Sequence, residues 1–165
     1  MLKTFLSGMF LVCIYCSGNL FAGTLSCSVT TAAACTGGTN VIILRMSGST
    51  NAHAELASQS TAAYASNVVC CSGITGLTTT CSGTFATAVK LSSVTNGHVE
   101  LGTQTNYGNS ACIQAPSGGS VTVFYGTSCT GYDTTVASMS ATTTNAHIGD
   151  ASAYANKICA TAVGG

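Results

Sequence analysis

The residues from Cys35 to Cys70 read CTGGTNVIILRMSGSTNAHAELASQSTAAYASNVVC, and the same order of key residues occurs twice more in this 165-residue chain. In each copy an opening cysteine leads through an apolar run to an Asn-x-His triplet, and a tyrosine and a closing cysteine follow. The copies lie at about 35–71, 81–112 and 129–159. A self-similar period of roughly 45 residues indicates one supersecondary unit that is used three times.

The local composition of each copy is typical of β-strands. β-branched and aromatic residues are frequent in Val41–Leu44, Ala88–Leu91 and Val121–Tyr125, and clusters of Ser, Thr and Gly bound these runs. The Ala-rich stretch from Ala52 to Ala65 keeps no apolar period of 3.6 residues, so it has little helical character. We therefore predict an all-β fold with two or three strands in each copy.

The composition excludes several classes of protein. The chain has 4 Lys or Arg, 4 Asp or Glu and zero formal net charge, and charged residues make up 5% of it, against about 25% in an ordinary soluble domain. It therefore lacks the basic surface that nucleic-acid binding requires. A hydrophobic content of 46% argues against disorder. We predict that the protein is not an enzyme, because the chain contains no G-x-S-x-G nucleophile elbow and its four acids are scattered.

Residues 1–22 have the pattern of a signal peptide. Lys3 supplies the positive charge, Phe5–Tyr15 is the apolar run, and Leu20–Ala22 forms the cleavage site. The apolar run is interrupted at Ser17–Asn19, which leaves it shorter than the roughly 20 residues that cross a bilayer. We expect a mature chain of residues 23–165 that is secreted or held at the cell surface, without membrane contact after cleavage.

Eight of the ten cysteines remain in the mature chain, and an even number in an exported protein indicates disulfides. If equivalent positions in the copies pair in the same way, three bonds form within the copies and two cysteines are left to form a fourth. The predicted pairs are Cys35–Cys70, Cys81–Cys112, Cys129–Cys159 and Cys27–Cys71.

The three histidines of the chain occupy the same position in the three copies. An imidazole with a carboxylate two residues later is a workable pair of transition-metal ligands on one strand face. The candidate ligands are His53, Glu55, His98, Glu100, His147 and Asp150, the last of which replaces Glu after an inserted Ile-Gly. The alternative is structural, with these polar groups satisfying one another in every copy. We favour the structural interpretation, because architecture is what a repeat reproduces, and we predict no cofactor.

Low charge also favours association, because exposed strand edges are usually protected by charged residues. The N-terminal segment 23–31 lies outside the copies and has strand character, and residues 32–165 form the β domain. Such a strand completes its own sheet or is donated to a neighbour, and a donation that does not close produces a filament. The residues of this candidate assembly strand are Leu25, Ser26, Cys27, Ser28, Val29, Thr30 and Thr31.

The Asn-x-His-x-Glu, Tyr and closing Cys pattern, in a small exported chain rich in Ser and Thr, resembles that of uncharacterised secreted microbial proteins. The whole is similar to protomers of extracellular helical fibrils. This resemblance implies an immunoglobulin-like β-sandwich, an inserted N-terminal donor strand and a homopolymer of the chain. In that case Cys27 and Cys71 would pair between molecules or stay free. The Thr runs that begin at Thr78 and Thr142 allow O-linked glycans as further partners. The alternative is a secreted glycan-binding or metal-binding β module, for instance one that is β-trefoil-like.

Overall fold

The structure is a computed structural model that describes residues 23–165, so the predicted signal peptide, residues 1–22, lies outside the described residues. The described chain forms eleven β-strands and one short 3-10 helix, Ala62–Tyr64. The all-β fold predicted from the sequence is therefore confirmed. Within residues 23–165, no helix has the length and apolar character needed to cross a membrane.

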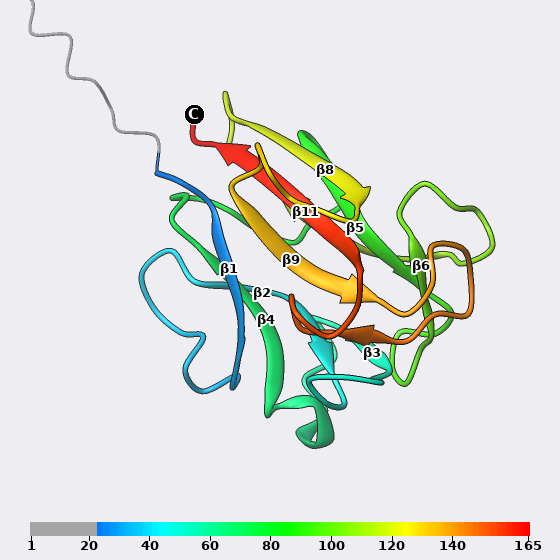
Figure 1. The fold of residues 1–165 in the computed structure, drawn as a ribbon. Helices are drawn as coiled ribbons and strands as arrows, with labels where there is room; N and C mark the ends of the chain where they lie inside the picture. Colours follow the sequence, from blue (N-terminus) through cyan, green and yellow to red (C-terminus); the bar gives the residue numbers. More distant parts are fainter. Residues whose placement is uncertain (1–22) are drawn as a thin grey trace, which may run out of the picture.

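The strands form three antiparallel sheets (Figure 1). The first sheet has the order β1-β4-β2-β3, with bounds Ser26–Thr30, Asn67–Ser72, Val41–Met46 and Ala54–Leu56. The second has the order β6-β5-β7, with bounds Val99–Leu101, Phe85–Leu91 and Asn109–Gln114. The third has the order β10-β9-β11-β8, with bounds Ile148–Gly149, Thr134–Met139, Asn156–Val163 and Ser120–Gly126.

Each sheet has the same plan. A middle strand (β2, β5 or β9) pairs on one side with the short strand that follows it and on the other side with the closing strand (β4, β7 or β11). In the first and third sheets a preceding strand, β1 or β8, pairs with the closing strand. In the second sheet a single bridge between Thr78 and Gln114 lies at this place.

The three sheets share one core. Buried apolar residues from all of them form a single cluster, which includes Leu44 of β2, Leu91 of β5 and Met139 of β9. An immunoglobulin-like sandwich would have two facing sheets, whereas the described strands form three. Each of the three sheets supplies buried apolar residues to the common core.

Four disulfides are formed, and they are the four pairs that the repeat predicts. They join Cys27 to Cys71, Cys35 to Cys70, Cys81 to Cys112 and Cys129 to Cys159. Each closes a loop of 30 to 44 residues, which is worth about 4 kcal/mol through the unfolded state. Such bonds are typical of an oxidising, extracellular environment. Each disulfide joins two cysteines of the same sheet-forming segment, and none of them connects two different sheets.

The N-terminal strand completes its own sheet in this structure. β1 pairs with β4 so that Cys27 lies opposite Cys71, the residue to which it is bonded. Leu25, just before the strand, is fully buried. The backbone N–H of Cys27 also donates to Oγ1 of Thr134 at 3.0 Å, which ties this strand to the third sheet.

Candidate metal centre

The residues on either side of each histidine join the three sheets to one another. Each flanking residue exchanges two backbone hydrogen bonds, of 2.8–3.0 Å, with a residue that flanks a histidine of another sheet. The three bridges are Ala52 with Ile148, Ala54 with Gly97, and Val99 with Ala146. All six residues are buried, so the bridges form a closed backbone ring over the core.

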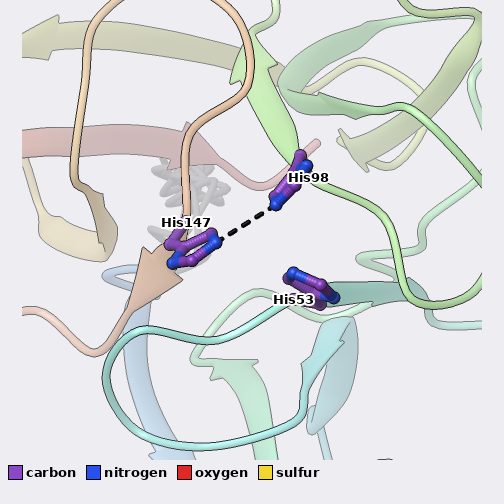
Figure 2. Close-up of side chains that lie close together, drawn as sticks. All are labelled: His53, His98 and His147. Carbon is purple, nitrogen blue, oxygen red and sulfur yellow. Dashed lines mark hydrogen bonds between the residues drawn. The ribbon is translucent and has the colours of Figure 1, made fainter.

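The histidines point away from that core. Successive side chains of extended backbone point to opposite faces, and the neighbours of each histidine face inward. His53, His98 and His147 are accordingly half-buried, and their rings lie close together (Figure 2). One ring nitrogen from each lies within 4.8 Å of the others, and Nε2 of His98 is 3.1 Å from Nε2 of His147. The sequence reasoning placed the histidines in equivalent positions but did not foresee that they meet.

The orientation of two imidazoles is set by asparagines from neighbouring sheets. Nδ1 of His53 lies 2.6 Å from Oδ1 of Asn96, and Nδ1 of His147 hydrogen-bonds to Oδ1 of Asn51. An amide oxygen only accepts hydrogen bonds, so Nδ1 carries the proton in both rings. Nε2 is thereby left with its lone pair free, which is the tautomer that a metal ion requires, and a hydrogen bond on the other nitrogen is the usual support of a histidine ligand.

The asparagines occupy a backbone conformation that suits few other residues. Asn51, Asn96 and Asn145 have φ angles of 49°, 54° and 59°, in the left-handed region. Asparagine tolerates this region better than most residues that carry a Cβ atom. Asn51 and Asn96 therefore serve both the turn before the histidine of their own sheet and the orientation of a histidine from another sheet.

The tyrosine of each copy also contacts the asparagine of a neighbouring sheet. The tyrosine hydroxyls contact these asparagines in three pairs. They are Tyr64 donating to Oδ1 of Asn96 at 3.2 Å, and the hydroxyls of Tyr107 and Tyr154 accepting from the backbone N–H of Asn145 at 3.1 Å and of Asn51 at 2.8 Å. Burial, and then the charge of Glu55, raise the pKa of Tyr64, so its hydroxyl keeps the proton that it donates.

Three serines, which the sequence reasoning missed, close the turns that carry the histidines. The backbone N–H of each histidine donates to a serine Oγ at 2.9–3.0 Å, in the pairs His53 with Ser47, His98 with Ser92 and His147 with Ser140. The signal in the sequence is a serine directly after the last apolar residue of each middle strand. These serines fix the position of each histidine backbone relative to its own sheet.

The carboxylates of Glu55 and Glu100 take no part in the cluster. Both side chains are fully buried. Glu55 accepts from the Thr61 N–H and the Thr95 hydroxyl, at 2.9 and 3.0 Å, and Glu100 accepts from the Tyr107 N–H at 2.8 Å. These oxygens satisfy loop groups. The histidines and glutamates of the sequence pattern therefore have different places in the structure. The histidines cluster with one another, and the glutamates hydrogen-bond to loops.

Asp150 is also outside the cluster, and it does not stand in the place of the missing glutamate. The residue of the third sheet that is equivalent to Glu55 is Gly149. Gly149 pairs with Ser138 of β9 as Glu55 pairs with Arg45 of β2. Oδ1 of Asp150 accepts from the N–H and the hydroxyl of Ser152, both at 2.8 Å, and these bonds lower the pKa of Asp150. Asp150 therefore caps a local turn.

The three imidazoles form a donor set that suits a transition-metal ion. Nε2 atoms around a tetrahedral Zn²⁺ with bonds of about 2.0–2.1 Å lie about 3.3 Å apart. The His98 and His147 nitrogens are 3.1 Å apart, so this pair already has the required spacing. Comparison of the chain with protein-family models, with curated proteins and with solved structures gave no match.

Proposed function

We propose that this chain is a secreted β module, built from three copies of one unit, that binds a divalent transition-metal ion. The observation that carries the proposal is the meeting of one histidine from each sheet, with ring nitrogens within 4.8 Å. Imidazole nitrogen is a ligand of Zn²⁺, Cu²⁺ and Ni²⁺, whereas Ca²⁺ and Mg²⁺ require oxygen ligands. Three histidines with a fourth, non-protein ligand are a known zinc arrangement, so Zn²⁺ is the ion that we assign.

The contact between His98 and His147 is compatible with a metal role. Nε2 of His98 hydrogen-bonds to Nε2 of His147 at 3.1 Å. The asparagine bond to Nδ1 of His147 places the lone pair on its Nε2, so His98 donates the proton between them. A metal ion would replace this proton and bind all three rings at once, whereas the proton links only one pair.

A bound ion would also link sheets that none of the four disulfides joins. Each of the four disulfides closes the segment of a single sheet. The ion would connect one residue of every sheet at the backbone ring. Because it binds the folded state, it stabilises the protein by about 2.7 kcal/mol when the free ion is at 100 times its dissociation constant. We propose that the metal is primarily a structural link, in a protein exported to an oxidising environment.

Metal analysis of the oxidised protein, residues 23–165, tests this function. After equilibration with equal amounts of Zn²⁺ and Ca²⁺, followed by desalting, we expect one Zn²⁺ and no Ca²⁺ per chain. The His98→Ala variant should lose the zinc. Asp150→Asn is the matched control, because this carboxylate belongs to the same sequence pattern yet lies outside the cluster, and it should retain one Zn²⁺. Zinc-free wild-type protein, or equal loss in both variants, would refute the proposal.

Assembly into a fibre is a second candidate function. β1 and β8 are the outer strands of their sheets, and β8 exposes Phe124, which is 43% accessible. With zero net charge, little repulsion opposes pairing of these edges with a second copy. Donation of β1 would break the Cys27–Cys71 bond within the chain and leave the two cysteines to pair between molecules or stay free. Negative-stain microscopy, with non-reducing gels, tests this candidate: filaments with disulfide-linked chains favour donation, and monodisperse single chains exclude it.

A further inference from the structure

We infer that the metal ion held by His53, His98 and His147 keeps one coordination position open on the outer face, and that this position binds a carboxylate. The inference rests on the proposed function and specifies the chemistry of the same site. It follows from three features of the described residues. The inner side of the histidine cluster offers no ligand, the side-chain oxygens of four residues of the sequence pattern are hydrogen-bonded, and three neutral imidazoles leave the charge of a divalent ion uncompensated.

The inner side of the site offers no ligand. The residues beneath the histidines are those that form the bridges, and their side chains are apolar or absent, as in Ala52, Val99 and Gly97. Their backbone N–H and C=O groups are used in the bridges themselves. A fourth ligand therefore approaches from the outer face, toward which the half-buried imidazoles point.

Side-chain oxygens of four residues of the Asn-x-His-x-Glu pattern are already hydrogen-bonded. Oδ1 of Asn51 and Oδ1 of Asn96 each accept from a histidine Nδ1. The carboxylate oxygens of Glu55 and Glu100 accept from loop groups in the buried interior. Moving any of them to the metal would leave a histidine or a buried loop N–H without its partner, which costs free energy. The fourth ligand consequently comes from outside the chain.

The charge of the site selects an anion. Three neutral imidazoles leave the full charge of a divalent ion in place, on a chain with zero formal net charge. A tetrahedral zinc with three histidines accepts an oxygen ligand in its fourth position. A carboxylate supplies both the oxygen and a negative charge. The source is either a small free acid or the carboxylate of a polypeptide, and the two are separated by experiment.

Cobalt substitution makes the open position visible. Co²⁺ takes the place of Zn²⁺ in such sites, and its visible absorption bands change when a ligand exchanges. The cobalt protein would be titrated with sodium acetate at constant pH and ionic strength, with sodium perchlorate as the balancing, non-coordinating salt. We expect a saturable shift of the bands with acetate and none with perchlorate, in the wild type and in Asp150→Asn alike.

The outcomes separate the inference from the function on which it rests. One Co²⁺ per chain with bands that acetate leaves unchanged would overturn the open position and leave metal binding intact. Failure to bind Co²⁺ or Zn²⁺ would refute the proposed function itself. A second titration compares a short peptide with a free C-terminal carboxylate and its amidated form: a shift with the free peptide alone assigns a polypeptide partner, and a shift with acetate but neither peptide assigns a small acid.

Discussion

His147 and Asn51 are separated by 96 residues in the chain, and yet Nδ1 of the histidine hydrogen-bonds to Oδ1 of the asparagine. The same relationship joins His53 to Asn96 in the next sheet. Each bond fixes an imidazole on one sheet to a turn of another. The candidate metal centre is therefore oriented by contacts between sheets, and its geometry depends on how the sheets meet.

Replacing Asn51 should weaken metal binding without removing a ligand. Loss of an outer partner of a histidine ligand typically reduces metal affinity by about 10–100-fold. Asn51→Gly keeps the left-handed turn, at φ 49°, while Asn51→Ala places a methyl group in that strained conformation and costs a further 1–2 kcal/mol or so of stability. Calorimetric zinc titrations and denaturant unfolding measure the two effects. Wild-type affinity in the glycine variant would show that the hydrogen bond to His147 is unimportant.

Zinc should raise the unfolding temperature in a concentration-dependent way. The ion binds only the folded state, so the shift grows with the logarithm of free zinc above the dissociation constant. His98→Ala should abolish the shift, because only two of the three clustered imidazoles remain. Thermal unfolding monitored by circular dichroism, with and without a chelator, measures it. A shift of equal size in the variant would mean that zinc stabilises the protein from another site.

The metal-free protein should lose stability when mildly acidified. Burial, and then the proximity of His53 and His147, lower the pKa of His98 from 6.5. Between that lowered value and 6.5 the unfolded chain binds the proton more readily than the folded chain does, so stability falls as the pH decreases through this window. Urea unfolding in chelator, above and below pH 6.5, measures the slope. His98→Gln should show a flatter dependence, and an unchanged slope in that variant would contradict the assignment.

Glu100 should contribute to stability but not to metal stoichiometry. Its buried carboxylate accepts from the Tyr107 N–H and from Nδ2 of Asn106. Glu100→Ala leaves these donors unpaired, at a cost of about 1–3 kcal/mol. Urea unfolding and metal analysis of the same preparation test the two statements together. If the Glu100→Ala variant is fully folded but binds no zinc, Glu100 would be a metal ligand after all.

Removing the Cys27–Cys71 disulfide tests the role of β1. The double variant Cys27→Ser, Cys71→Ser should lose about 2–5 kcal/mol of stability and remain a single chain, because the strand pairing with β4 persists. Analytical ultracentrifugation and urea unfolding measure both. Filaments that form only in this variant would show that the disulfide restrains strand donation.

The repeat made much of the fold predictable. Equivalent spacing identified the strand-rich units and the cysteine pairs, since a pattern that recurs along the chain indicates equivalent local structure. Strand composition likewise predicted an all-β protein. The number of sheets did not follow, because local signals do not say whether units share a sheet. The two-sheet arrangement came from a resemblance, and the described chain has three sheets.

The histidine cluster was predictable only in part. The sequence placed His53, His98 and His147 in equivalent positions, but linear spacing does not reveal that equivalent positions converge on one point. The structural interpretation of these histidines stays a prediction, against which the proposed metal binding is to be tested. Pairing each histidine with the acid two residues later also failed as a ligand rule, since buried loop groups already occupy the oxygens of Glu55 and Glu100.

The contact between Asn51 and His147 joins the first sheet to the last part of the chain, which has a consequence for biogenesis. Asn51 is among the first site residues to leave the ribosome, and the histidine that it orients, His147, is the last of the three. A truncated chain that lacks His147 would hold no complete donor set. If the ion binds as proposed, a loaded site would therefore report that the last segment has closed the ring onto the first.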